Sequence, residues 1–233
     1  MARYTAYELA KRGCALLLAG RSPSEVEAVA RDVHIRYGVP AQPRTFDARD
    51  FASHPALIEE TVSQLGHLDG VFLFFGEQGD QAKAQHSFEE ARAIVEVNFL
   101  GAVSLLTLVA NHLEERRSGV IVGVSSVAGD RGRRTNYVYG SSKGALSLFL
   151  QGLRNRLSLS NVQVVTVKPG YVDTAMTYGV VTSRLVASPQ RVARGIVRSV
   201  EKGRDVVYLP WFWQWIMLVI RLIPERVFKR LNL

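Results

Sequence analysis

Three side chains in the second half of the chain have the types and spacing needed to move a proton to or from a carbonyl oxygen. Tyr139 and Lys143 are four residues apart, and Ser126 precedes them. Residues four apart on a helix lie on one face, one turn from each other. A phenol has a pKa of about 10, which a nearby ammonium group lowers by favouring the phenolate. The sequence therefore predicts Tyr139 as an acid/base, Lys143 as the group that tunes it, and Ser126 as a hydroxyl that orients the substrate oxygen.

Composition narrows the class of protein. The chain has 233 residues, of which 47% are hydrophobic, and this fits one domain with a sizeable core. The single cysteine, Cys14, indicates a reducing, cytoplasmic setting. The net charge of +8 raises nucleic-acid binding as a possibility, but the basic residues are dispersed and not interleaved with aromatic ones, which argues against it. The histidines show no ligand spacing with cysteine or carboxylate, so we expect no metal site.

Apolar runs and helical patterns alternate regularly along the chain. The expected strands are 14–19, 42–46, 70–75, 120–124, 162–167 and 206–209. The expected helices are 2–12, 24–37, a segment beginning at 53–55, 87–116, 136–157 and 189–201. This alternation predicts an α/β fold in which helices cover both faces of a parallel sheet.

Four motifs stand in an order and spacing that resemble the short-chain dehydrogenase/reductase family. They are Asn98-Phe-Leu-Gly101, the segment 119–129 that contains Ser125-Ser126, Tyr139-Gly-Ser-Ser-Lys143, and Lys168-Pro-Gly-Tyr-Val-Asp-Thr174. The resemblance covers nearly the whole chain. It implies a Rossmann-like, doubly wound single domain that interconverts a ketone and a secondary alcohol with NAD(P)(H). It also implies a catalytic tetrad, in which Lys143 binds the nicotinamide ribose as well as tuning Tyr139, and Asn98 holds a proton-relay water.

The resemblance further implies a cofactor surface at the carboxyl ends of the strands. Arg21 stands where an acidic residue would accept the ribose 2′-OH of NAD, and an arginine suits the 2′-phosphate of NADP. NADP(H) is therefore favoured over NAD(H), with a plain surface arginine as the alternative. Asp47 matches an adenine-contacting aspartate, and a turn or capping role is its alternative. The other expected cofactor contacts are Gly76, Tyr139, Lys143, Pro169, Gly170, Val172 and Thr174.

The beginning of the sequence departs from the family pattern. No strand and no Gly-x-x-x-Gly-x-Gly turn precede the first expected helix, so the resemblance implies an N-terminally truncated member. In the family the absent strand lies between those that begin near Cys14 and Gly70. Its loss would separate them by roughly 9.6 Å, two strand spacings, so either they close the gap or the sheet is split. A late start codon is the favoured explanation over a decayed product or a natural variant. We expect the 233-residue chain to bind cofactor poorly.

Three segments resemble one branch of the family more narrowly. Phe74-Phe75-Gly76 stands where most members have Asn-Asn-Ala-Gly, which leaves any cofactor role of Phe74 open. Together with 129–134 and 202–210, it resembles the decaprenylphosphoryl-2-keto-erythro-pentose reductases. That branch reduces a 2-keto sugar on a polyprenyl phosphate after a flavoprotein oxidase has made the ketone. The resemblance thus implies a lipid-linked sugar substrate and a flavoprotein partner.

The C-terminal segment, 211–233, is expected to form an apolar and basic helical tail beyond a domain of residues 1–210. Residues 211–223 contain all three tryptophans and are too few for the ~20 that span a bilayer. Basic residues follow, as in helices that lie at a membrane surface. Packing on the domain core or across a dimer is the equal alternative. The predicted location is therefore cytoplasmic, with peripheral contact at the inner face of the cell membrane if the helix meets lipid.

Two functions of different classes remain at this stage. The first is the NAD(P)(H)-dependent oxidoreductase that the tetrad implies. The second is a non-catalytic, membrane-associated protein that keeps the fold without its cofactor, which the absent glycine turn favours. The resemblance also implies a homo-oligomer, formed through the long helices that carry Asn98 and Tyr139.

Overall fold

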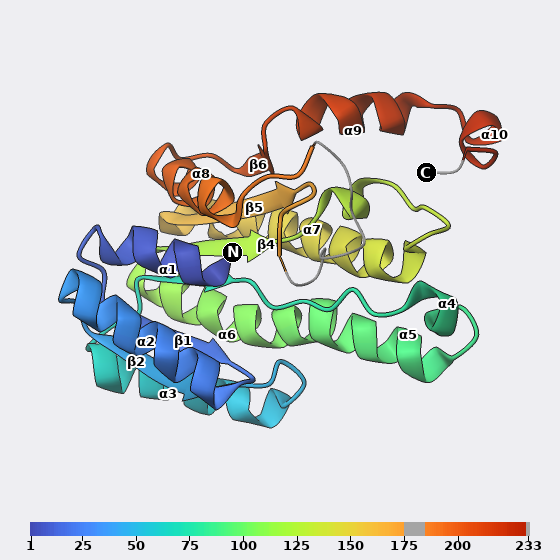
Figure 1. Cartoon of the computed structure of the whole chain (residues 1–233). Helices are drawn as coiled ribbons and strands as arrows, with labels where there is room; N and C mark the ends of the chain where they lie inside the picture. Colours follow the sequence, from blue (N-terminus) through green and yellow to red (C-terminus); the bar gives the residue numbers. More distant parts are fainter. Residues whose placement is uncertain (175–184, 232–233) are drawn as a thin grey trace.

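All the paired strands are parallel, and they lie in two separate sheets (Figure 1). The structure is a computed structural model, and it describes residues 1–174 and 185–231. A two-stranded sheet pairs β1 (Leu16–Gly20) with β2 (Ala41–Thr45). A four-stranded sheet has the order β3 (Gly70–Leu73), β4 (Gly119–Val124), β5 (Val162–Pro169), β6 (Val206–Leu209).

Helices alternate with these strands, which confirms the predicted Rossmann-like α/β fold. The α-helices are α1 (Ala2–Ala10), α2 (Pro23–Tyr37), α3 (His54–Leu65), α4 (Gln81–Ala84), α5 (Phe88–Val95), α6 (Gly101–Arg116), α7 (Tyr137–Leu157), α8 (Pro189–Glu201), α9 (Trp213–Leu222) and α10 (Glu225–Phe228). Shorter turns are η1 (Phe51–Ser53), η2 (Glu96–Leu100), η3 (Val127–Asp130) and η4 (Ser158–Ser160). Gly38, the predicted end of α2, has the left-handed conformation with φ 68° that glycine adopts readily.

The division of the sheet falls between β1 and β3, where the sequence predicted either a closed gap or a split. Neither strand hydrogen-bonds to the other, so the split is the outcome. The structure does not by itself support the expected N-terminal truncation. Helix α1 packs against α8 and α2, and the Met1 side chain contacts the buried cluster on β4 and β5.

The core forms on both faces of β4 and β5, the two middle strands of the larger sheet. Ile121 and Val164 point to one face, where they pack with α6 and α7. Val122 and Val165 point to the other face, where they pack with α8. All four are at most 1% exposed, as expected for parallel strands covered on both sides. This core places the carboxyl ends of β4 and β5 together.

The stretch predicted as one helix over 87–116 contains a π-helical turn, η2, which the periodicity did not reveal. Gly101 at its end lies against the Ala48 carbonyl, since a Cβ there would approach that oxygen to 2.4 Å. Residues Phe88–Arg116 are long and apolar enough to cross a membrane by length and composition. Half of the most apolar window is buried inside the fold, which is the pattern of a core helix.

Helix α9 lies over η3 at the same end of the molecule as the carboxyl end of β5 (Figure 1). On its inner face Trp213 and Met217 are buried against Val127, with Tyr171 packed alongside. Arg131, just after η3, donates hydrogen bonds to the carbonyl of Ile223 and to that of Ile220. These contacts fix the C-terminal helix to the loop that follows Ser126.

Candidate active site

Ser126 and Tyr139 come together because η3 packs very closely against α7. A Cβ on Gly129 would lie 2.7 Å from the Gly144 nitrogen, and one on Gly140 would lie 2.8 Å from the Ala128 carbonyl. Only glycine permits these approaches between backbones. As a result, the Ser126 hydroxyl lies near enough to Tyr139 to influence its pKa. The hydroxyl groups of Ser126 and Tyr139, thirteen residues apart in sequence, thus lie in the same part of the structure.

Lys143 is on the same helix, one turn beyond Tyr139, and is only 3% exposed. Its ammonium donates a hydrogen bond of 3.1 Å to the carbonyl of Val124, at the end of β4. Gly76 lies against it, and a Cβ at that position would be 2.9 Å from the Lys143 nitrogen. Burial disfavours the charged form and lowers the pKa of Lys143 to about 8.

The effect on Tyr139 differs from the sequence expectation. The sequence predicts that Lys143 lowers the pKa of the tyrosine, whereas in the structure burial raises the pKa of Tyr139. The nearby Ser126 hydroxyl acts in the opposite direction on this pKa and is the smaller influence. The phenol is therefore held in its protonated form, ready to donate a proton.

Asn98 belongs to the π-helical turn η2 and is fully buried. Its amide group accepts a hydrogen bond from the Glu77 nitrogen and donates one to the Glu77 carbonyl, each 2.7 Å long. It donates a third, of 3.0 Å, to the hydroxyl of Ser142. The sequence predicts that Asn98 holds a proton-relay water. In the structure its side chain holds the loop after β3, which keeps Gly76 beside Lys143.

The neighbouring serine has a different position. Ser125 is buried, and its hydroxyl donates to the Lys143 carbonyl at 2.8 Å and hydrogen-bonds with the Ser147 hydroxyl at 2.7 Å. It ties β4 to α7, while Ser126 stays partly accessible beside Tyr139. Of the two serines, only Ser126 has a side chain that solvent can reach, and its role toward a substrate stays a prediction.

Arg21 and Asp47 lie at the carboxyl ends of β1 and β2, the two strands of the smaller sheet. Asp47 accepts a hydrogen bond from the Arg49 nitrogen at 2.9 Å, the turn role left open as an alternative. This bond, the Arg49 side chain and the charge of Arg21 lower the pKa of Asp47. The Arg21 side chain is exposed. The two predicted adenosine-end residues are thus close in space, and the arginine is accessible to an anion.

The segment after β5 carries the remaining predicted cofactor contacts. The Gly170 nitrogen donates to the Leu209 carbonyl at 3.0 Å, and Pro169 pairs with Leu209 in the sheet. Val172 is buried and bridges to Ala187, and Thr174 ends the described part of this loop. A Cβ on Gly170 would lie 1.9 Å from the indole nitrogen of Trp213, so the turn is covered by α9.

The sequence matches the family described as short chain dehydrogenase over residues 1–184. The chain belongs to this short-chain dehydrogenase/reductase family. Uncharacterized oxidoreductase Rv2073c of Mycobacterium tuberculosis is 36% identical over 227 residues, which cover 96% of this chain and 91% of that protein. An uncharacterized oxidoreductase of Streptomyces coelicolor is 35% identical over 229 residues, which cover 97% and 90%.

Solved structures of short-chain dehydrogenases share the fold. One from Sphingobium yanoikuyae, in complex with NADPH, has a TM-score of 0.79 and 21% identity, covering 99% of this chain and 91% of that one. A ketone-specific alcohol dehydrogenase from Comamonas testosteroni has a TM-score of 0.80 and 19% identity, covering 99% and 90%. As a member of the short-chain dehydrogenase family, the protein is an enzyme that uses a nicotinamide cofactor.

The residues of this short-chain dehydrogenase fit the two ends of a dinucleotide. At the nicotinamide end, Trp213 has a buried indole N–H against Gly170, and the described residues offer it no hydrogen-bond acceptor. Arg21 is accessible at the adenosine end. Between them, no glycine-rich turn is found among the described residues, and the N-terminus of α1 has no side-chain cap.

Some residues that shape the site were missed from the sequence. Asp130 is one, because its buried carboxylate accepts hydrogen bonds from Lys168 and from the Tyr208 hydroxyl, at 2.5 and 2.7 Å. Ser142 is another, since it connects Asn98 to the Tyr139 carbonyl. No local pattern marks either residue. Only the tertiary approach of β5, β6 and η3 brings the first network together.

The lowered pKa of Lys143 has a measurable consequence for stability. Between about pH 8 and the ordinary lysine value of 10.5, the folded protein binds fewer protons than the unfolded chain, so stability from this group rises with pH. Lys143→Met should therefore raise the free energy of unfolding at pH 7 by on the order of 3 kcal/mol, and this gain should shrink towards pH 10. Urea unfolding of both proteins without cofactor, at several pH values, measures it. The exposed Lys83→Met is the control, and a gain that does not change with pH would contradict the assignment.

Proposed function

We propose that this enzyme is an NADPH-dependent reductase of a ketone to a secondary alcohol, with Asn98, Ser126, Tyr139 and Lys143 as its catalytic group. The observation that carries the proposal is the close packing of η3 on α7, which brings the Ser126 hydroxyl near Tyr139, one helical turn from the buried Lys143. A donor pair of this kind is suited to one carbonyl oxygen. A non-catalytic, membrane-associated protein would not need a buried lysine beside two hydroxyl groups.

In the proposed reaction the bound nicotinamide supplies a hydride to the carbonyl carbon. Ser126 holds the carbonyl oxygen, and the Tyr139 hydroxyl transfers its proton to that oxygen as the C=O bond becomes C–O–H. The ammonium of Lys143 stabilises the phenolate that remains, until a proton returns from solvent. Asn98 acts through Glu77, because its two hydrogen bonds to that backbone hold the loop that places Gly76 against Lys143.

Replacement of the proton donor tests this mechanism. Tyr139→Phe removes the hydroxyl that donates the proton, and kcat/KM with NADPH and a ketone should fall by on the order of 10²–10⁴-fold. The unfolding free energy should change by only about 1 kcal/mol, since a single hydroxyl group is removed and the ring is kept. Tyr137→Phe, which alters an exposed tyrosine two residues earlier, should retain wild-type turnover. Substantial residual activity in Tyr139→Phe would refute the role.

Preference for NADPH over NADH is proposed to come from Arg21. Its exposed guanidinium at the end of β1 is suited to a 2′-phosphate, to which it donates charge-assisted hydrogen bonds. Arg21→Asp should raise KM for NADPH by roughly 10–100-fold, the loss of one or two such bonds, and leave KM for NADH unchanged or lower. Steady-state kinetics with both cofactors measures the ratio. Arg31→Asp, on α2, makes the same charge change at another exposed position, and an equal effect there would refute the assignment.

The substrate is proposed to be a 2-keto sugar carried on a polyprenyl phosphate, the substrate class of the branch that residues 74–80, 129–134 and 202–210 resemble. An exposed apolar face of α9 supports a lipid-linked substrate, because Trp215, Val219 and Leu222 are 58%, 63% and 73% exposed. In that branch a flavoprotein oxidase makes the ketone. A partner of this class would then supply the substrate, and peripheral contact with the membrane would bring the enzyme to it.

A comparison of two substrates tests this assignment. A polyprenyl-phosphate-linked 2-keto pentose should be reduced with kcat/KM at least about tenfold above that of the free 2-keto pentose, because an apolar chain adds about 0.8 kcal/mol per buried CH₂. The assay follows NADPH oxidation in detergent micelles, with Tyr139→Phe as the background. Equal kcat/KM values for the two substrates would contradict a lipid-linked substrate while leaving the proposed chemistry intact.

A further inference from the structure

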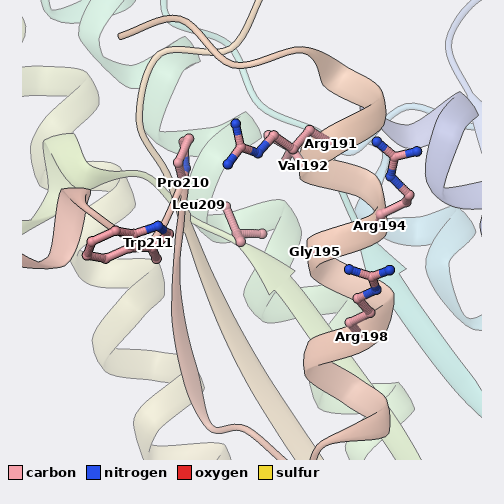
Figure 2. A pocket seen from close by; sticks show the side chains of 8 residues that line it. All are labelled: Arg191, Val192, Arg194, Gly195, Arg198, Leu209, Pro210 and Trp211. Atoms are coloured by element: carbon pink, nitrogen blue, oxygen red, sulfur yellow. The ribbon is translucent and has the colours of Figure 1, made fainter.

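A hollow of about 420 Å³ lies between α8 and the end of β6, lined by residues that have no part in the proposed catalytic group. Figure 2 shows its walls, with Leu209 and Pro210 on one side and the arginine side chains of α8 on the other. The lining residues are Arg191, Val192, Arg194, Gly195, Arg198, Leu209, Pro210 and Trp211. The volume is within the roughly 300–1,000 Å³ of sites that hold small ligands or headgroups.

The hollow has a strongly positive wall. Arg191, Arg194 and Arg198 follow the helical spacing that places residues on one face of α8, and all three are exposed. Within the described part of the chain, none of the three guanidinium groups forms an ion pair with a carboxylate, and no acidic residue lines the hollow. Glu201, on the last turn of α8, is paired instead with Arg12 at 2.5 Å. Arg198 acts on Glu201 only at longer range, where its charge helps to lower the pKa of that carboxyl. Three guanidinium groups around one hollow, without a direct ion pair among the described residues, are suited to phosphate.

An apolar surface adjoins this positive wall. Trp211 lines the hollow, is 65% exposed, and stands just before α9. The outer face of α9 continues the apolar surface with Trp215, Leu218, Val219 and Leu222, which are 44% to 73% exposed. Their spacing places them on the face opposite the buried Trp213. Tryptophan is enriched where an apolar phase meets water, and arginine binds the phosphates at that boundary.

We infer that the hollow on α8, with Trp211 and the outer face of α9, is a binding site for the phosphate headgroups of an anionic lipid bilayer. The guanidinium groups would bind lipid phosphates while the outer face of α9 enters the acyl region. A second copy of this chain fits the surface less well, because a two-fold contact would bring the same arginines opposite one another. Nucleic acid would leave the apolar face of α9 without a partner. This inference deepens the lipid-linked substrate of the proposed function, yet its test needs no turnover.

Vesicle co-sedimentation of the full chain tests the site. We expect the protein to bind phosphatidylcholine vesicles that contain phosphatidylglycerol, and to bind pure phosphatidylcholine vesicles far more weakly. The triple variant R191Q/R194Q/R198Q should lose on the order of 100-fold in affinity for the anionic vesicles, since each basic residue near such a surface strengthens binding several-fold. The variant R31Q/K83Q/R92Q removes the same charge from α2, α4 and α5 and should stay within about threefold of wild type.

Two further measurements separate the outcomes. Because all three tryptophans lie at residues 211–215, their fluorescence should shift to shorter wavelength on binding anionic vesicles, and W215S/V219S should weaken that binding. Inorganic pyrophosphate is the soluble probe. Binding of pyrophosphate without vesicle binding would overturn the lipid assignment, and so would equal losses in the two triple variants. Loss of turnover in Tyr139→Phe with unchanged vesicle binding would show that the two sites are independent.

Discussion

The burial of the Lys143 ammonium is the constraint on which the rest of the site depends. The ammonium group is almost fully removed from solvent, and it donates a hydrogen bond to the carbonyl of Val124. Burial of a charge costs free energy unless polar groups surround it, and the lowered pKa of about 8 reports that cost. The free-energy cost of burying this ammonium must be offset by favourable interactions with other groups. A bound ribose and a phenolate at Tyr139 are groups that would supply it, because both favour the ammonium.

Neighbouring elements hold Lys143 in place from several sides. The Ser125 hydroxyl donates a hydrogen bond to the Lys143 carbonyl, which ties α7 to the end of β4. The close approach at Gly129 brings η3 near enough for Ser126 to reach Tyr139. On the far side, Asn98 fixes the loop that carries Gly76. A π-helical turn places Asn98 there, and such turns concentrate at functional sites because they redirect one side chain without ending the helix. Contacts from β4, from η3 and from the loop after β3 therefore all fix the position of the buried ammonium.

Much of this arrangement could be predicted from the sequence, since it depends on local patterns. The strands β4 and β5 are continuous apolar runs, and α7 carries Tyr139 and Lys143 at helical spacing. What could not be predicted depends on tertiary approach. The pKa of Tyr139 is raised because burial outweighs its polar neighbours, and no spacing rule contains that balance. The hydrogen bonds of Asn98 to Glu77, and the hollow beside Arg191, arise from segments far apart in the chain.

Helix α9 connects the proposed lipid site to the catalytic end of the sheet. Its inner face covers Gly170 through Trp213, while its outer face is the apolar part of the proposed membrane surface. A helix with its side chains is about 10 Å thick, so a bilayer on one side of α9 and a ketone on the other would be separated by little more than that distance. Arg131 holds the end of this helix to the loop that follows Ser126. A lipid-linked substrate would therefore reach Tyr139 while its chain stays in the membrane, and this gives the exposed tryptophans a reason to lie where they do.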